Sequence, residues 1–341
     1  MYGFLNDYSE FAHENLLKAM FENSRTQSAP YGNDEFCERA REEIKKYFDD
    51  PECDIHFLEG GTQTNLTFIS SVLRPHQGVI TAVTGHINCH ETGSIEATGH
   101  KVLAIESEDG KIRAEQIKEF VEAHYNDESS EHIVQPAMVY ISNPTEVGTI
   151  YLKSEFYEIS EMCKAKNLLL YLDGARLGTA LCSDINDLSL SDIKRLCDAF
   201  YIGGTKMGAL YGEALVISDS AVGKDFRYIQ KQKGALAAKG FGIGIQFYEL
   251  FRDGLYFRLA EHANRMANIL ENGIKRKGYQ LRYDTHTNQI FPIFPKPVIQ
   301  KLKSDFTFSF WEKYSDTDDV VRLCTSWATD IAEVEKFIEK I

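Results

Sequence analysis

The sequence predicts an α/β protein with a seven-stranded, mainly parallel sheet and a smaller α+β carboxy-terminal part. Two observations support this prediction. Up to about Gly242, short β-branched or apolar runs alternate with amphipathic stretches of helical length, and beyond that point the rhythm changes. Alternating strands and helices are typical of parallel sheets covered on both faces. The predicted strands of the sheet are Asp54–Leu58, Val79–Val83, Lys101–Ile105, Ala137–Ile141, Leu168–Leu172, Ala199–Ile202 and Ala214–Ile217.

The helices between these strands are predicted from apolar spacing. Phe36, Ala40, Ile44 and Phe48 recur at every fourth residue, which is the stripe of a helix that lies on a sheet. After the change of rhythm, the pattern predicts helices over Gly244–Phe251, Gly254–Lys277 and Asp330–Ile341, with strands over Tyr279–Tyr283, Gln289–Phe294, Phe306–Phe308 and Val320–Cys324.

This organisation divides the chain into two unequal domains. We expect a large α/β domain over residues 1–243, which includes an amino-terminal segment, and a small α+β domain over residues 244–341. Open α/β folds bind their ligands at the carboxyl ends of the sheet strands, so we expect the functional site in a cleft at that edge.

Composition excludes several classes of function. The chain has 37 Lys and Arg against 51 Asp and Glu, a formal charge of −14, so a nucleic-acid-binding surface is not expected. Apolar runs such as Leu168–Leu172 are far shorter than the roughly 20 residues that span a bilayer. The first ten residues lack the basic and apolar regions of a targeting signal, so we expect a cytoplasmic protein without a membrane partner.

The seven cysteines are scattered and form no C-x-x-C pair. Disulfide frameworks and zinc sites need even counts or paired spacings, so we expect reduced thiols and no metal.

The first element with chemical meaning is the turn Glu59-Gly60-Gly61-Thr62-Gln63, which follows a predicted strand and opens a helix. Glycines let the backbone approach an anion, and the free amides of a helix start, with the Thr62 hydroxyl, suit a phosphate group. A Gly-Gly-Thr turn also occurs as an ordinary connection between a strand and a helix.

The second element is a strand that ends at Asp173, in the run Leu168-Leu169-Leu170-Tyr171-Leu172-Asp173-Gly174-Ala175-Arg176. A carboxylate there is able to hold a proton on a heterocyclic nitrogen, which turns a pyridine ring into an electron sink. The alternative is a helix cap or an ion pair with Arg176.

The third element, Gly203-Gly204-Thr205-Lys206, places a lysine among small residues just after a strand, 33 residues after Asp173. Such a lysine is able to form a Schiff base once burial and nearby cations lower its pKa. A lone lysine near glycines is more often a surface charge. The conjunction of phosphate turn, strand-end Asp and Gly-rich Lys is much more specific than any one of the three.

These motifs resemble fold-type I pyridoxal-phosphate enzymes, and among them the threonine aldolase and β-eliminating lyase family. The resemblance runs almost from end to end, and Asp173-Gly174-Ala175-Arg176 and Gly203-Gly204-Thr205-Lys206 are its most specific parts. Further matching stretches are Asn6-Asp7-Tyr8-Ser9, Tyr31-Gly32-Asn33-Asp34, Gly85-His86-Ile87-Asn88, Glu91-Thr92-Gly93, Pro144-Thr145-Glu146-Val147-Gly148-Thr149 and Val321-Arg322-Leu323-Cys324-Thr325-Ser326-Trp327.

The resemblance implies a fold-type I, transferase-like fold, pyridoxal 5′-phosphate as cofactor and a role for each matching residue. Lys206 is expected to bind the cofactor covalently, and Asp173 to partner its ring nitrogen. The remaining implied roles are the phosphate cradle at Gly61, Thr62 and Gln63, the imidazole stacked on the ring at His86, the substrate carboxylate clamp at Arg176 and Arg322, and the substrate pocket at Asn6 and Tyr31. Packing in the core is a nearly equal alternative for Tyr31.

The implied activity is low-specificity L-threonine aldolase, which cleaves a small amino-acid substrate, L-threonine or L-allo-threonine, to glycine and acetaldehyde. The catalytic residues would be Lys206, His86 and Asp173. The base that takes the hydroxyl proton stays open among His86, His90 and Glu91. The resemblance also implies a homodimer or homotetramer.

One departure bears on the reaction. Many threonine aldolases carry a second histidine where this chain has Thr145, although other members also have a Thr-Glu pair there. Two alternatives to aldolase activity therefore remain: another reaction on the same cofactor, such as β-elimination, transamination or racemisation, and a binding protein without catalysis. A protein without catalysis would have no reason to keep all the expected site residues at their family positions. This argues against the second alternative, since the chain keeps Asp173, Lys206, Arg176 and Arg322.

Overall fold

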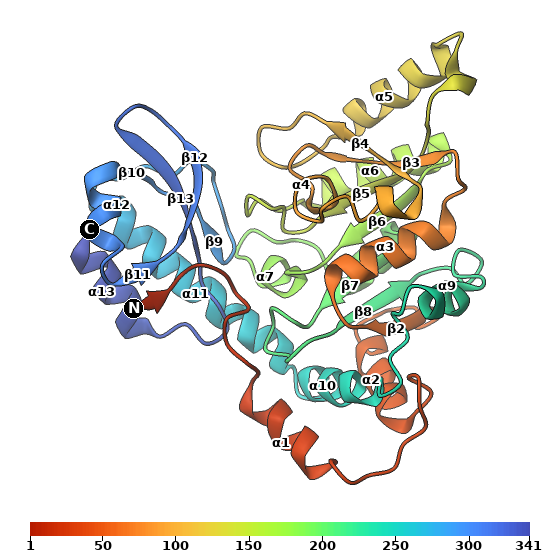
Figure 1. The fold of residues 1–341 in the computed structure, drawn as a ribbon, viewed down its shortest axis with the longest axis horizontal. Coiled ribbons are helices and arrows are strands. Elements are labelled where there is room, and N and C mark those ends of the chain that lie inside the picture. The colour runs from red at the N-terminus through yellow and green to blue at the C-terminus, as the bar shows by residue number, and fades with distance from the viewer.

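A seven-stranded sheet forms the centre of the large domain in the computed structural model, which describes residues 1–341 (Figure 1). The strands lie in the order β2, β8, β7, β6, β5, β3, β4, and only β8 runs antiparallel to its neighbours. All seven predicted strands are confirmed, each within two residues of its observed bounds: β2 (Asp54–Leu58), β3 (Gln77–Ala82), β4 (Lys101–Ile105), β5 (Gln135–Ser142), β6 (Leu169–Asp173), β7 (Ala199–Gly203) and β8 (Glu213–Ile217).

Helices cover both faces of this sheet. The helices up to the carboxy-terminal part are α1 (Glu14–Glu22), α2 (Glu35–Lys45), α3 (Gly61–Val72), α4 (His86–Cys89), α5 (Ala114–Asn126), α6 (Lys153–Lys166), α7 (Leu177–Leu181), α8 (Leu190–Leu196), α9 (Phe226–Gln232) and α10 (Phe241–Arg252), followed by the long α11 (Leu255–Arg276), with short 3₁₀ turns at Glu96–Thr98 and Ser130–His132. Helix α2 begins where the Asp34 side chain accepts a hydrogen bond from the Cys37 amide. Three residues of its predicted stripe are buried, whereas Phe36 is partly exposed and Cys37 takes its place in the core.

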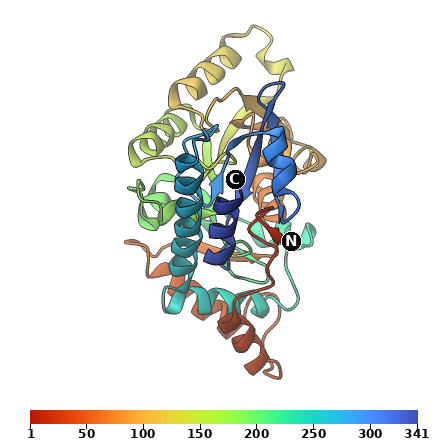
Figure 2. The same ribbon diagram turned by 90° about the vertical axis from the view of Figure 1, so that its left-hand side faces the viewer.

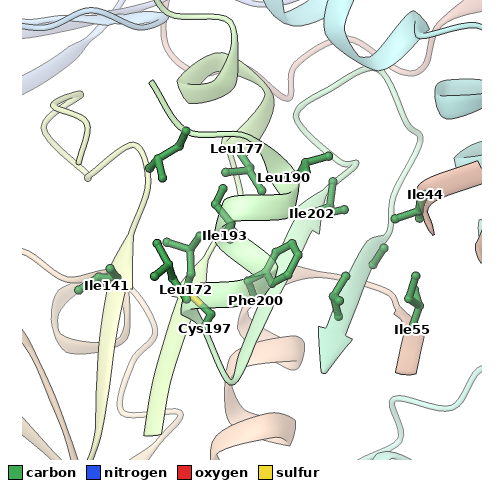
Figure 3. Packing of buried hydrophobic residues seen from close by; sticks show 14 of the residues in the cluster. Ile44, Ile55, Ile141, Leu172, Leu177, Leu190, Ile193, Cys197, Phe200 and Ile202 are labelled. Atoms are coloured by element: carbon green, nitrogen blue, oxygen red, sulfur yellow. The ribbon is translucent and has the colours of Figure 1, made fainter. Parts of the chain in front are cut away.

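Strand alternation sends side chains to two separate cores. The larger core includes Leu172 and Phe200 from the sheet, packed against helices such as α8 (Figure 3). The smaller core, on the face covered by α3, includes Tyr140, Tyr171 and Tyr201 from three neighbouring strands. Because side chains two residues apart share a face, the strand that buries Tyr171 on the α3 side also aims Asp173 there.

The carboxy-terminal part contains a second sheet and the long helix α11 (Figures 1 and 2). Its elements are β9 (Gln289–Ile290), β10 (Ile293–Pro295), α12 (Lys296–Leu302), β11 (Phe306–Thr307), β12 (Ser309–Lys313), β13 (Asp318–Cys324) and α13 (Ile331–Lys340). The amino terminus joins this part, since β1 (Tyr2–Gly3) pairs in parallel with β11. The division into residues 1–243 and 244–341 stays a prediction.

One predicted strand is wrong. Tyr279–Tyr283 forms only an isolated bridge, between Leu281 and Pro292. Its start is set by Gly278, whose φ of +88° turns the chain sharply after α11, and just two further backbone hydrogen bonds join it to the neighbouring segment. The predicted strand Gln289–Phe294 is likewise split into β9 and β10.

Two further features concern the cysteines and the length of the apolar helices. All seven cysteines are free thiols. No helix combines the length and the apolar character needed to cross a membrane.

Close backbone approach between β6 and β7 makes Gly174 sensitive to substitution. A Cβ added at Gly174 would lie 1.9 Å from the carbonyl oxygen of Tyr201. We expect Gly174→Ala to lower the free energy of unfolding by about 3 kcal/mol. The added Cβ would meet a backbone carbonyl, which cannot rotate away as a flexible side chain can. Gly242→Ala is the matched control, since its nearest atom would be 3.7 Å away and the position is helical. Equal thermal midpoints for the two variants would contradict this account.

Candidate active site

A cavity of about 580 Å³ opens at the carboxyl ends of β5, β6 and β7, next to β12 and β13. Seven of the ten predicted site residues line it: Gly61, Thr62, His86, Asp173, Arg176, Lys206 and Arg322. Further lining residues are Tyr8, Glu59, His90, Glu146, Tyr201, Thr205, Tyr211, Glu213 and Trp311. Residues from distant parts of the chain thus converge where the topology predicts a ligand.

Asp173 is the best-supported side chain of this cavity. Its carboxylate accepts hydrogen bonds from the hydroxyls of Tyr140 and Tyr201, each at 2.5 Å, from the Asn65 amide at 3.1 Å and from the backbone N–H of Ala175 at 2.9 Å. The two tyrosines come from β5 and β7, the strands on either side of β6, and the smaller core buries both rings. The carboxylate is therefore fixed in position before any ligand arrives.

These contacts keep Asp173 ionised although it is buried. Burial by itself opposes ionisation, but the charge of His86 and the hydrogen bonds from Tyr140, Tyr201 and Ala175 outweigh it and hold the pKa below its usual value. A buried anion at the cavity wall is suited to stabilise a positive charge on a ligand, such as a protonated ring nitrogen.

His86 begins helix α4 and is held by two carboxylates. Its Nδ1 lies 2.7 Å from Oε1 of the buried Glu91, and its backbone N–H donates to Glu146 Oε1 at 2.9 Å. Burial lowers the pKa of the imidazole, yet the Glu91 hydrogen bond and the Asp173 charge outweigh it, so the pKa is raised overall. Glu91 also accepts hydrogen bonds from Asn65 and Ser94, and this network joins His86 to Asp173.

A free helix start lies at one end of the cavity. Gly60 caps helix α3 without a side-chain hydrogen bond, so the first amides of the helix have no partner from a cap. Gly61 must lack a side chain, because a Cβ there would lie 2.8 Å from the Tyr201 hydroxyl that holds Asp173. Together with Thr62, these residues fit a phosphate group.

Lys206 follows β7 and carries a free amine. Its Nζ takes part in no hydrogen bond or ion pair, and the centre of the Tyr8 ring lies 5.8 Å away. Burial and then the positive charge of Arg176 lower the pKa of the lysine, and the nearby acids oppose this only in part. A lysine with a lowered pKa and no partner is suited to attack an aldehyde.

Glu213 is an unpredicted acid in the same wall. It is buried, and it accepts hydrogen bonds from the Gly204 amide at 3.0 Å and the Thr205 hydroxyl at 2.9 Å, the two residues that precede Lys206. Burial raises the pKa of Glu213 to about 8. Only the fold brings it near the lysine, through antiparallel pairing of β7 and β8.

The two predicted arginines differ in their partners. Arg176 forms a bidentate pair with the fully buried Asp7, with distances of 2.6 and 3.1 Å from Nε and Nη2. This pair, assisted by the Asn288 amide, holds the pKa of Asp7 at about 2 although burial opposes ionisation. Arg322 instead donates one hydrogen bond from Nη2, to the carbonyl of Leu5, and its buried Nε has no partner. Arg322 is thus the arginine without a carboxylate partner, whereas only Nη1 of Arg176 stays free of the pair with Asp7.

Three predicted site residues do not line the cavity. The Asn6 side chain accepts hydrogen bonds from the Tyr8 amide and the Ser9 hydroxyl, so it caps its own turn. The Gln63 carbonyl accepts from the amide of Glu59 at 3.3 Å. Tyr31 lies elsewhere, with φ of +63° and its ring 4.4 Å from Nζ of Lys231.

Thr145, at the position where related sequences often have a histidine, also faces away from the cavity. Its hydroxyl lies 2.7 Å from that of Thr149, and the side chain is buried. The adjoining Glu146 lines the cavity instead and accepts a hydrogen bond from the Ser142 hydroxyl at 2.6 Å. In this chain, therefore, Glu146 and not the residue at position 145 contributes a side chain to the cavity wall.

The comparisons with known proteins agree with this geometry. Residues 9–295 match the beta-eliminating lyase family. The chain belongs to that family.

Among solved structures, a threonine aldolase from Leishmania major is 47% identical, covers 99% of this chain and 98% of its own, and has a TM-score of 0.97. The low specificity L-threonine aldolase of a Pseudomonas species is 30% identical over 319 residues, which is 91% of this chain and 88% of that protein. An aspartate aminotransferase from Thermus thermophilus, at 14% identity and a TM-score of 0.72, shares the fold. The predicted family, the fold-type I architecture and the cofactor are confirmed: this lyase is pyridoxal-phosphate-dependent.

The raised pKa of Glu213 makes stability depend on pH. The carboxyl is protonated in the folded chain up to about pH 8 but ionises near pH 4.5 when unfolded. Its contribution to stability is fully present below pH 4.5 and is lost as pH rises through about 8. We therefore expect Glu213→Gln to gain stability relative to wild type between pH 5 and 8, measured as the thermal midpoint at each pH. A constant difference across this range would mean that Glu213 is ionised in the folded protein.

Proposed function

We propose that this protein is an L-threonine aldolase that cleaves L-threonine or L-allo-threonine to glycine and acetaldehyde. The carrying observation is one cavity that presents the ionised Asp173, the unpartnered Lys206 amine and the free donors of Arg322. The aldolases from Leishmania major and the Pseudomonas species, similar over nearly their full lengths, support the choice among reactions of this cofactor.

The cavity fits pyridoxal 5′-phosphate at each part of the molecule. The uncapped start of α3 at Gly61 and Thr62 would hold the phosphate, Lys206 would bond the aldehyde carbon, and Asp173 would face the ring nitrogen. The side chain of His86 would lie against the ring. When bound, pyridoxal phosphate supplies an electron sink for bonds at the substrate α-carbon.

The chain's own residues would do the rest. Asp173 would keep a proton on the ring nitrogen, since its two tyrosine donors and Asn65 hold it ionised. Arg322 would bind the substrate carboxylate with its free guanidinium donors, an arrangement that suits bidentate recognition. Arg176, already paired with Asp7, would add positive charge and fix the amino-terminal segment beside the site.

We also propose that the protein works in the cytoplasm as a homodimer or homotetramer. Large side chains stand exposed in the amino-terminal segment and near α9, with Phe11 at 69%, Phe21 at 80% and Tyr228 at 77% exposure. Burial of such side chains between copies would be favourable. Free thiols suit a reducing compartment. Light scattering at micromolar concentration tests the assembly, and a monomer would contradict it.

The function is tested by the ultraviolet–visible spectrum of the purified protein with pyridoxal phosphate, followed by addition of L-threonine with coupled detection of acetaldehyde. We expect a visible band and acetaldehyde release. A band without acetaldehyde would move the protein to another reaction of the same cofactor. Absence of any band would contradict the whole proposal.

The role of Lys206 is tested by Lys206→Ala, which should abolish covalent cofactor binding because no other lysine lines the cavity. Borohydride treatment of wild type should fix the reduced cofactor to the peptide that contains Lys206, and mass spectrometry identifies that peptide. Lys231→Ala, outside the cavity, is the control. Covalently fixed cofactor in borohydride-treated Lys206→Ala would refute Lys206 as the cofactor-binding lysine.

The two arginines should differ when each is replaced by Lys. Arg322→Lys should raise KM for L-threonine by roughly 10-fold or more, because a bidentate contact is lost. Arg176→Lys should mainly lower the thermal midpoint, because it breaks the buried pair with Asp7. Steady-state kinetics and thermal unfolding of both variants separate the effects. The reverse pattern would make Arg176 the main carboxylate ligand.

A further inference from the structure

Two histidines flank helix α4 and face the same cavity in different states. His86 begins the helix and His90 caps its other end, with ring centroids 5.6 Å apart. His86 is bonded through Nδ1 to Glu91. The imidazole of His90 makes no hydrogen bond within the chain, and the residue is exposed. Only His90 thus has both ring nitrogens free.

Positive charge surrounds His90 on several sides. Besides His86 on its own helix, it faces Arg322 on β13, Arg176 before α7 and Lys206 after β7. Partial burial and then these charges lower the pKa of His90 below its usual value, so the imidazole is neutral at neutral pH. The nearby carboxylates Glu91 and Glu146 are engaged by His86, through its ring and its backbone amide respectively.

The other acids that line the cavity already take part in hydrogen bonds, and the raised pKa of Glu213 keeps that carboxyl protonated at neutral pH. Asp173 already accepts four hydrogen bonds, as described above. Glu146 accepts from Ser142 and from the His86 amide, and Glu213 from Gly204 and Thr205. Glu59 belongs to the phosphate turn, so in the ligand placement proposed above it would lie near the phosphate and not near the substrate carboxylate. His90 is left as the unengaged base beside Arg322.

We propose that His90 is the catalytic base that takes the proton from the β-hydroxyl of the amino-acid substrate. The inference rests on the proposed aldolase function and deepens it. His90, Arg322 and Lys206 line the same cavity. A substrate bound through its carboxylate to Arg322 and through its amine toward Lys206 would present its β-substituent to the rest of the wall, to which His90 belongs. His86 keeps its proton and serves as a fixed partner of Glu91 and of the ligand.

The step balances in protons and electrons. A free ring nitrogen of His90 takes the hydroxyl proton, and the electron pair of the O–H bond becomes the second bond of the aldehyde C=O. The Cα–Cβ bond breaks, and its electron pair remains at Cα, delocalised into pyridoxal phosphate. Acetaldehyde leaves, Cα takes a proton from solvent to give glycine, and His90 returns its proton to solvent.

The first test needs no turnover. In cofactor-free protein, the imidazole resonances of His90, assigned by comparison with His90→Asn, should titrate below the ordinary histidine range, while those of His86 should titrate above it. The reverse order would overturn the proposal, because His90 would then be charged at neutral pH.

The second test separates base catalysis from binding. His90→Asn should lower kcat for L-threonine cleavage by roughly 100-fold or more. It should also remove the loss of kcat/KM on acidification that protonation of His90 causes in wild type. Exchange of the glycine α-proton with deuterated solvent uses the same cofactor site but no hydroxyl, so it should stay close to the wild-type rate. His132→Asn, on an exposed 3₁₀ turn, is the matched control.

Each alternative outcome has a distinct meaning. Cleavage by His90→Asn within a few-fold of wild type would overturn the role of His90. Equal losses of cleavage and of glycine exchange would also overturn it, since they would indicate a general effect on the site. Wild type that exchanges the glycine proton but releases no acetaldehyde would refute the proposed aldolase function itself.

Discussion

The site depends on keeping one buried carboxylate ionised. Asp173 lies where β6 ends, 4% exposed, and an unpaired charge at that depth would be costly. Its hydrogen-bond donors come from both neighbouring strands and from α3, so the sheet order and the helix position serve the same group. Gly61 must be small because a side chain there would collide with the Tyr201 hydroxyl, and Gly174 because one there would collide with the Tyr201 backbone carbonyl.

Two of the basic side chains at the cavity are paired with carboxylates, so few cations there remain unpaired. Asp7 engages Arg176, and Glu91 engages His86, which leaves Arg322 and Lys206 as the available cations of the cavity. A chain with net charge −14 thereby has a local site that would suit the carboxylate of an amino acid and a phosphate group. The two ion pairs hold the side chains of the cavity wall in place, whereas Arg322 and Lys206 are available to bind ligands.

Much of this was predictable from the sequence, and the remainder depends on contacts across the fold. The strand ending at Asp173 and the glycines around Lys206 are local patterns, so the sheet and most residues that line the cavity from the predicted set could be predicted. Glu213 reaches Lys206 only through pairing of β7 with β8, and Asp7 reaches Arg176 across 169 positions of chain, which no spacing rule reveals. The tyrosine donors Tyr140 and Tyr201 lie in strands that the sequence predicts, but only the pairing of β5 and β7 with β6 brings their hydroxyls to Asp173.

The central claim is that an ionised Asp173 keeps the ring nitrogen of the bound cofactor protonated. Nuclear magnetic resonance of the enzyme loaded with pyridoxal phosphate labelled with ¹⁵N in the ring measures this directly. The account predicts the chemical shift of a protonated ring nitrogen in wild type at neutral pH and above, and its loss in Asp173→Asn. A deprotonated ring nitrogen in wild type at neutral pH would contradict it.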